Sequence, residues 1–249
     1  NIREIHDIRG TCYMTEPVNT PLGAAQCPSF EQVRDNKKEY AKATKIQYDW
    51  QDEVYGKTVI QRHGNMMLVQ NPPAKSLTTE ELDYIYSLPY TRRYHPSYEA
   101  LGGVPGIEEV RFSITHNRGC FGYCNFCSIA LHQGRKITVR SEKSVLEEAE
   151  RITKMPDFKG YIHDVGGPTA NFRHTSCEKQ IEKGLCMGKK CLAPTPCPAL
   201  KADHSEYLAM LRKIRAIKGI KRVFIRSGIR YDYLMEDKND EFIRELIKH

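Results

Sequence analysis

Three cysteines within eight residues constrain this chain more than any other feature of its sequence. Cys120, Cys124 and Cys127 follow directly on a short segment, residues 110–114, in which apolar and polar residues alternate as they do in a strand. Closely spaced thiolates are typical ligands of iron–sulfur clusters, and a four-iron, four-sulfur cube has four irons to ligate. Three cysteines leave one iron without a protein ligand, so that iron is free to bind a cofactor or a substrate.

The spacing also argues against simpler explanations for these cysteines. A structural zinc site usually pairs two short Cys hairpins, whereas this loop has the spacing C-x3-C-x2-C and no fourth ligand immediately beyond it. Gly119 and Gly122 let the chain bend tightly around an inorganic core. Core cysteines without a metal would not gather in such a turn, so we expect an iron–sulfur cluster here in preference to zinc.

Composition and charge set wider limits on the class of protein. Of the 249 residues, 40% are hydrophobic and 28% are charged, as in a globular protein with a sizeable core. No apolar run approaches the length that spans a bilayer, and we expect no membrane partner. Nine cysteines, an odd number, favour metal ligation in a reducing compartment over a secreted disulfide framework, so we expect a cytoplasmic protein. The net charge of +7 is scattered, and it permits a nucleic-acid partner without demanding one.

The two parts of the chain differ in their patterns. Residues 1–105 predict an α+β region with a polar helix over 29–48, capped by Ser29 and Gln32, and a hairpin over 58–70. We place the boundary near Pro105. Beyond it, in residues 106–249, three predicted strands alternate with three predicted helices over 144–155, 203–217 and 242–247, which favours an α/β fold with parallel strands.

Two further features concern an insertion in the second part and the two ends of the chain. Residues 172–202 predict a cysteine-rich insertion between a strand and a helix. The chain starts at Asn1 instead of a methionine, and residues 241–249 have the pattern of a helix cut short, so we expect a piece of a longer protein.

The cysteine loop resembles that of the radical SAM superfamily, whose members cleave S-adenosylmethionine (SAM). The resemblance rests on the C-x3-C-x2-C spacing after a first strand and on Phe126, an aromatic residue before the last cysteine. It implies that Cys120, Cys124 and Cys127 hold a [4Fe–4S] cluster, that the open iron chelates the amino and carboxylate groups of SAM, and that Phe126 packs near the adenine.

Longer segments are similar to the YgiQ family of bacterial radical SAM proteins. These segments are Val69–Pro73, Ser113–Cys120, His132–Arg135 and Tyr161–Arg173. The resemblance covers nearly the whole chain and implies a smaller N-terminal region, then the first half of a partial (β/α)6 barrel that is truncated here. Since that family has no established substrate, the resemblance indicates the cofactor better than the reaction.

Two further pairs of residues are candidates for SAM binding. Gly166 and Gly167 end the second predicted strand, where ligands of strand–helix barrels bind, and they are similar to the superfamily's Gly-Gly-Glu segment. Pro168 replaces the acidic residue, so the contact would use backbone carbonyls only. Arg226 and Ser227 end the third strand and are candidates for the SAM carboxylate or ribose. A plain strand-ending turn is the alternative in both places.

A second group of cysteines predicts a second metal site. Cys177, Cys186, Cys191 and Cys197 lie amid glycine and proline, with nearby lysines that offset charge or simply form a solvated face. An auxiliary iron–sulfur cluster and a structural zinc ion are both chemically sound there. The spacings of eight, four and five intervening residues match no tight hairpin motif and do not decide between them.

These observations predict a radical SAM enzyme. An external one-electron donor, such as flavodoxin or ferredoxin, would reduce the cluster, and SAM cleavage would then give a radical that takes hydrogen from a substrate the sequence does not identify. No catalytic residue is predicted. The alternatives are a non-enzymatic iron–sulfur electron carrier or redox sensor, and a zinc-stabilised nucleic-acid-binding module.

Overall fold

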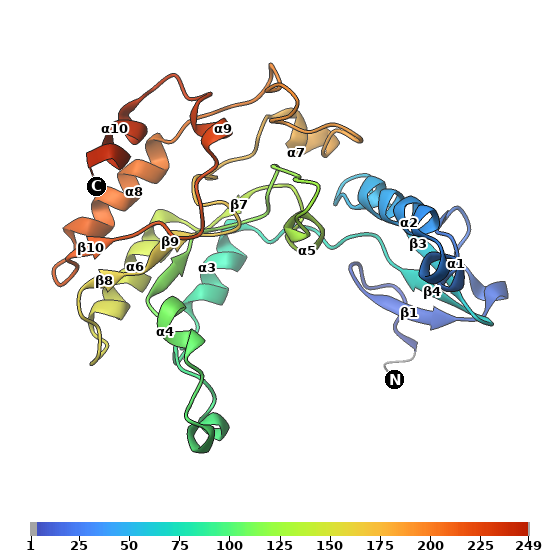
Figure 1. Ribbon diagram of the computed structural model, residues 1–249, viewed down its shortest axis with the longest axis horizontal. Helices are drawn as coiled ribbons and strands as arrows, with labels where there is room; N and C mark the ends of the chain where they lie inside the picture. The colour runs from blue at the N-terminus through green and yellow to red at the C-terminus, as the bar shows by residue number, and fades with distance from the viewer. Residues whose placement is uncertain (1–3, 249) are drawn as a thin grey trace.

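The structure is a computed structural model that describes residues 4–248. It contains a four-stranded sheet near the N-terminus and a group of short parallel strands further along the chain, and these lie side by side along the long axis of the molecule (Figure 1). Across this described range, no helix has both the length and the apolar character needed to cross a membrane. The boundary near Pro105 stays a prediction.

The N-terminal sheet carries two helices on one face. Its strands follow the order β1-β4-β3-β2, and the predicted hairpin is confirmed as β3 and β4, with His63 opposite Met66. The elements are β1 (Cys12–Thr15), the 3-10 helix η2 (Pro17–Asn19), β2 (Ala25–Gln26), α1 (Phe30–Asp35), α2 (Lys37–Trp50), β3 (Val59–His63) and β4 (Met66–Gln70). Cys27, Ala43 and Val59 are buried between the helices and the sheet.

The prediction of one continuous helix over 29–48 is wrong in one respect. The capping box of Ser29 and Gln32 is confirmed, but the helix breaks at Asn36 into α1 and α2. Asn36 has extended dihedrals, φ −140° and ψ 114°, and its side chain accepts a hydrogen bond from the backbone N–H of Lys38. An asparagine that caps a new helix start in this way competes with helix continuation.

Four short strands in two parallel pairs follow in the second part of the chain, as predicted for an α/β fold. β5 (Ser113–Thr115) pairs in parallel with β9 (Asp164–Gly166), and β10 (Arg222–Val223) pairs in parallel with β8 (Tyr161–Ile162). The Val165 N–H donates to the Phe224 carbonyl at 3.1 Å, so the segment 161–166 lies between the other two strands. Closure of these strands into part of a barrel stays a prediction.

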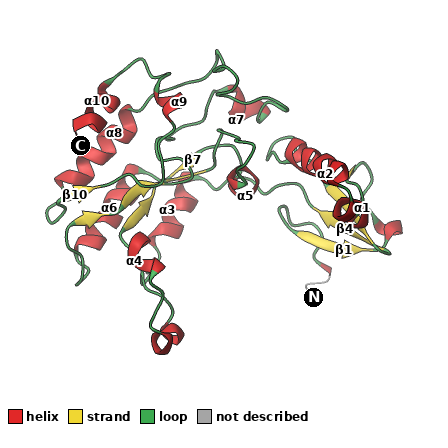
Figure 2. Ribbon diagram, in the orientation of Figure 1, coloured by secondary structure: helices red, strands yellow, loops and turns green. Residues whose placement is uncertain are grey.

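Three helices share a core with these strands, the third by packing on the second (Figure 2). They are α6 (Glu142–Thr153), α8 (Ser205–Ala216) and α10 (Glu241–Lys248). Their apolar faces share one core with the strands, in which Ile114, Val165 and Phe242 are buried. Two expected bounds were wrong. The cap of α6 is Ser141 instead of Ser144, and the strand begins only at Ser113, because residues up to 110 form the short helix α4 (Gly106–Val110).

The remaining elements lie in the segments between these strands and helices. They are α3 (Thr79–Ser87), the 3-10 helix η3 (Pro96–Leu101), β6 (Asn117–Arg118), α5 (Ile129–Gln133), β7 (Thr138–Val139), α7 (Lys179–Lys183) and α9 (Tyr231–Leu234). β6 and β7 pair antiparallel, and the chain between them carries the cysteine loop and α5. The segment 172–202 holds α7 as its only helix and is otherwise irregular.

Candidate functional site

The cysteine loop lies where the parallel strands end. β5 ends at Thr115, and the next backbone N–H, that of His116, donates to the Gly166 carbonyl at 2.9 Å. The loop therefore starts beside the carboxyl end of β9. Loops at the carboxyl ends of parallel strands are the usual place for ligands in α/β folds.

The loop's own geometry depends on glycine at two positions. Gly119 has φ +83°, and a Cβ there would collide with the Lys136 carbonyl oxygen. A Cβ at Gly122 would collide with the guanidinium of Arg230, which reaches over this glycine and donates to Cys124 Sγ at 3.2 Å. Because Gly122 has no side chain, the positively charged guanidinium of Arg230 can contact the thiol of Cys124.

Arg230 is a residue of the site that the sequence did not predict. Its pKa is raised above the usual value by its ion pair with Asp232 and then by Cys124, while partial burial opposes the shift. Arg230 lies 106 residues from Cys124, directly before α9, and no local pattern marks it. Only the folded chain shows that it faces the loop.

The three thiols of the loop are the candidate metal ligands. All three are free; Cys120 is buried, and Cys124 and Cys127 are partly buried. In the part of the chain that the structure describes, no three His, Cys, Asp or Glu side chains are close enough together to hold one metal ion. A four-iron cube with its thiolate ligands is anionic, so the contact between Arg230 and Cys124 suits it.

A glycine turn packs beside the loop. Gly166 ends β9, and a Cβ there would collide with Ser227 Oγ, while a Cβ at Gly167 would collide with Asn117 Oδ1. Ser227 Oγ accepts a hydrogen bond from the Gly167 N–H at 3.3 Å. The structure therefore brings together three of the predicted residues, Gly166, Gly167 and Ser227, and adds Asn117.

Asn117 joins this turn to the cysteine loop. Its Nδ2 donates to the carbonyls of Thr169 and Phe172, at 3.1 and 2.8 Å. Its Oδ1 is buried and has no hydrogen-bond partner among the described residues. Thr169 Oγ1 also lies 3.5 Å from Cys120 Sγ, and the ring of Phe172 stacks on Phe121 at 3.9 Å between centroids. The loop and the turn thus form one packed unit.

The other two predicted residues lie apart from this unit. The Arg226 side chain pairs with Glu109 at 2.7 Å on the surface, and its backbone N–H donates to Asp164 Oδ1. Phe126 exposes 91% of its side chain. The roles expected for Arg226 and Phe126 in SAM binding stay predictions.

The N-terminal part forms a second wall beside the loop. Tyr48, near the end of α2, lies with its ring 4.9 Å from that of Tyr123 and donates to the Cys127 carbonyl at 3.5 Å. Glu53 pairs with Lys136 at 2.5 Å. Between these walls lies a cleft of about 510 Å³. Its lining includes both partners of that ion pair together with Lys75, Arg118, His132 and Arg135.

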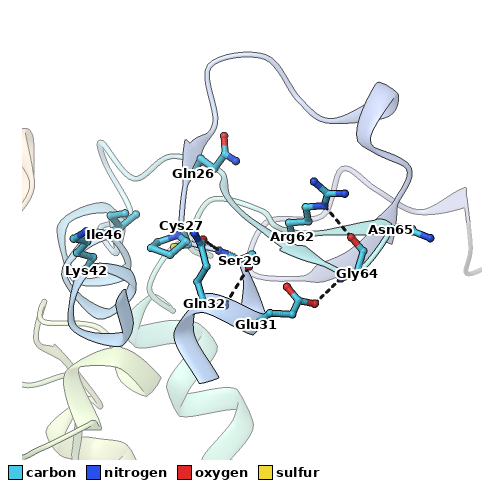
Figure 3. Close-up of a pocket in the computed structure, with 11 residues that line it drawn as sticks. Gln26, Cys27, Ser29, Glu31, Gln32, Lys42, Ile46, Arg62, Gly64 and Asn65 are labelled. Carbon is cyan, nitrogen blue, oxygen red and sulfur yellow. Dashed lines mark hydrogen bonds between the residues drawn. The ribbon is translucent and has the colours of Figure 1, made fainter. Parts of the chain in front are cut away.

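A wider hollow of about 1000 Å³ lies on the N-terminal sheet itself, beside α1 and α2 (Figure 3). Its polar groups bond to one another: Glu31 accepts from the Gly64 N–H at 2.8 Å, and Arg62 donates to the Gly64 carbonyl. Burial raises the pKa of the Cys27 thiol that lines it. With its polar groups paired internally and its thiol held in the protonated form, this hollow is a poorer candidate site than the cysteine loop.

The buried His116, at the base of the loop, should make the stability of the protein depend on pH. It is fully buried between the Ala170 carbonyl, 2.8 Å from Nε2, and the Arg173 guanidinium, 3.5 Å from Nδ1. Burial, then the charges of Arg173 and Arg140, lower its pKa from 6.5 to about 3. The folded protein keeps this ring neutral while the unfolded chain binds a proton below pH 6.5.

We therefore expect the free energy of unfolding to fall as the pH drops from 6.5 towards 3, measured by urea denaturation at each pH. His116→Gln should flatten this part of the curve, whereas His132→Gln, at an exposed histidine, should not. The same slope in His116→Gln as in the wild type would contradict the assignment.

The chain is similar to known proteins along its whole length. Residues 1–113 match the family model described as Radical SAM N-terminal. A UPF0313 protein of Clostridium botulinum is 56% identical over 248 residues, covering 100% of this chain and 38% of the relative. A UPF0313 protein of Clostridium perfringens is 52% identical over 246 residues, covering 98% of this chain and 37% of the relative. No solved structure matches.

These matches support the radical SAM superfamily as the class of the protein. The particular relatives are bacterial and bear the name UPF0313, so the narrower resemblance to the YgiQ family stays a prediction. The family model ends at residue 113, just before the first cysteine of the loop. The chain spans 38% of the length of the first of these relatives, so these matches do not show the activity of the whole protein.

Proposed function

We propose that this chain forms the cofactor-binding part of a radical SAM enzyme, with Cys120, Cys124 and Cys127 as ligands of a [4Fe–4S] cluster. The observation that carries the proposal is the junction of the three free thiols with the glycine turn at Gly166 and Gly167. An electron carrier needs no second binding surface beside its cluster. An enzyme that places a cofactor on an open iron does need one.

The residues of the site would share the work as follows. Bound there, the cluster and SAM would supply radical chemistry, in which one electron from an external donor cleaves SAM into methionine and a 5′-deoxyadenosyl radical that takes a hydrogen atom from the substrate. Arg230 offsets negative charge at Cys124. The Gly166 carbonyl accepts from the His116 N–H, so the Gly167 carbonyl would receive the ammonium group of SAM. The stacked rings of Phe121 and Phe172, both fully buried, keep water from the base of the loop.

The cleft beside the N-terminal wall supports an enzyme over a carrier. It is roomy enough for part of a substrate and is lined by charged groups from both parts of the chain. A substrate held there would lie near the cysteine loop, since Arg118, just before the loop, and His132, just after it, both line the cleft. We therefore assign the substrate-binding role to this cleft.

The test uses the full-length protein, reconstituted with iron and sulfide without oxygen and then reduced. We expect an electron paramagnetic resonance signal of a [4Fe–4S] cluster that shifts when SAM is added, followed by release of 5′-deoxyadenosine. A signal indifferent to SAM would leave an electron carrier or redox sensor. Zinc in place of iron at this loop would favour the structural-metal alternative.

A variant of the glycine turn sharpens this test. In Gly167→Ala the new Cβ collides with Asn117 Oδ1, so we expect iron binding with the SAM-induced shift lost. Gly106→Ala is the control, because no atom lies within 4 Å of its new Cβ and it begins a surface helix. An unchanged shift in Gly167→Ala would remove the glycine turn from the proposed SAM site.

A further inference from the structure

The segment that follows the glycine turn has little to hold it in place. Between residues 173 and 204 the only helix is the five-residue α7, and the only buried apolar side chains are Leu185 and Leu192. A loop of this length without regular structure is uncommon in a compact protein unless it is functional. Segments with so small a core are commonly held by disulfides or metals, and all four cysteines here are free thiols.

Backbone hydrogen bonds bring three of these cysteines together. The Cys197 N–H donates to the Cys191 carbonyl at 2.9 Å and closes a turn between them. Cys191 Sγ lies 3.4 Å from the hydroxyl of Ser176, the neighbour of Cys177 in the chain. The Lys201 N–H donates to the Ser176 carbonyl at 2.8 Å and holds the end of the segment against its beginning. Three separate stretches of the chain therefore converge.

Arg135 connects the fourth cysteine, Cys186, to this group. Arg135 donates to the carbonyls of Cys186 and Lys189, at 3.4 and 2.9 Å. Arg135 thus holds the backbone at Cys186 and at Lys189, two residues before Cys191.

Two buried donors beside the thiols lack an acceptor. Gln180 is 3% exposed and accepts from the Ser176 N–H at 3.3 Å, but its Nε2 has no partner among the described residues. Arg135 is 7% exposed, and its Nε likewise has none in that range. A buried donor without an acceptor costs about 1–3 kcal/mol and is rare in native structures. Anionic sulfur beside Ser176 and Cys186 would supply the missing acceptors.

The surrounding charge also suits an anionic group. Residues 174–201 contain five lysines against two glutamates, an excess of three positive charges. One of the two glutamates, Glu178, already pairs with Lys201 at 2.5 Å. Four thiolates around iron or zinc carry net negative charge, which this excess offsets.

We propose that Cys177, Cys186, Cys191 and Cys197 ligate a second iron–sulfur cluster. The four thiols, like those of the first loop, include no three within reach of a single ion in residues 4–248. The unpaired Gln180 Nε2 and Arg135 Nε favour a cluster over one zinc ion, since the sulfides of a cluster add acceptors beside the cysteine thiolates. Binding would draw the segment closed, as metal binding commonly does in small loop-rich units.

The second site would lie against the first loop. The Arg135 guanidinium stacks on the ring of Tyr123 at 4.0 Å, and Lys190 donates to Asn125 Oδ1 at 2.6 Å. Tyr123 and Asn125 stand on either side of Cys124. The same arginine therefore contacts the first loop and the backbone of the second cysteine group.

The test separates the two sites in the full-length protein. In the variant Cys120→Ala/Cys124→Ala/Cys127→Ala, reconstituted without oxygen, we expect iron and sulfide at about half the wild-type amount. The variant Cys177→Ala/Cys186→Ala/Cys191→Ala/Cys197→Ala should keep the other half and its response to SAM. Cys12→Ala, at an exposed thiol on β1, is the control and should keep all the iron.

The possible results distinguish this inference from the proposed function. Loss of all iron in the first variant, with the second variant at the wild-type amount, would overturn the second cluster and leave the first site intact. One equivalent of zinc in the first variant would overturn the assignment of iron. Iron in the first variant and none in the second would support the second cluster while contradicting the proposed function.

A measurement on the unaltered protein guards against variants that fail to fold. With metal bound, Cys177, Cys186, Cys191 and Cys197 should resist alkylation by iodoacetamide and should react once a chelator has been added, as followed by peptide mass spectrometry. Cys12 should react in both conditions, since it is exposed. Equal alkylation of all four cysteines with and without chelator would overturn the second site.

Discussion

Cys124→Ala abolishes the SAM-dependent signal and the formation of 5′-deoxyadenosine in the full-length protein: this is the largest effect we expect on function. Each of Cys120, Cys124 and Cys127 would hold one iron, so the loss of any one leaves a second iron without a protein ligand. Losing a group that only hydrogen-bonds to a metal ligand already costs about 10- to 100-fold in activity. Loss of the ligand itself should lower the rate of 5′-deoxyadenosine formation by at least about 100-fold.

The matched control is Cys27→Ala, at a buried thiol of the N-terminal sheet whose Sγ faces the Ala43 carbonyl at 3.9 Å. Both variants lose a partly or fully buried thiol, but only one lies in the loop. Rates are measured with SAM and a chemical reductant, and iron is determined on the same samples. A Cys124→Ala protein that still forms 5′-deoxyadenosine at the wild-type rate would refute the assignment of this loop.

Glu148→Gln should give the largest loss of stability. Glu148 lies on α6, is 5% exposed, and forms ion pairs with both Arg140 and Arg92. Burial lowers the pKa of Arg140 to about 10 and also lowers that of Arg92. Both arginines stay charged at neutral pH, so removing the carboxylate leaves them without their anionic partner. We expect a loss of about 3–5 kcal/mol in the free energy of unfolding, as for other buried ion pairs deprived of one member.

The neighbouring Glu147→Gln is the control. Glu147 is exposed on the same helix, and its carboxylate lies 3.8 Å from Lys143, so its loss should change stability by no more than about 0.5 kcal/mol. Urea denaturation of both variants at pH 7 checks the difference. A loss below about 1 kcal/mol in Glu148→Gln would show that the two arginines find other partners, since Arg140 also donates to the carbonyls of Thr115 and Ser144.

The position of this ion network links stability to the candidate site. Arg140 donates to the carbonyl of Thr115, the last residue of β5, at 2.9 Å, and the Arg140 N–H donates to the carbonyl of His116. The chain enters the cysteine loop within a few residues of these contacts. We therefore expect a substitution of Glu148 to disturb the cysteine loop as well, through the contacts of Arg140 at the end of β5.

Local signals explain which elements were predictable. The capping box of Ser29 and Gln32 uses residues three apart, and the hairpin turn at Gly64 lies between two apolar strands, so both can be read from neighbouring residues. The break at Asn36 was missed because the helical pattern continues on both sides of it. The cap of α6 at Ser141 was missed because Arg140 engages the Ser144 hydroxyl, which only the folded chain reveals.

By itself the sequence determined the three-cysteine loop, its glycines and the glycine turn, because ligand spacing and strand-ending glycines are properties of adjacent residues. Only the tertiary structure decided that Arg230 touches Cys124 and that Asn117 and Ser227 close on Gly167. These partners lie about 50 to 110 positions apart in the chain, and their contacts arise from the parallel pairing of β5, β9 and the strand that follows. No local pattern encodes such contacts, since many sequences satisfy the same strand and helix signals while bringing different side chains together.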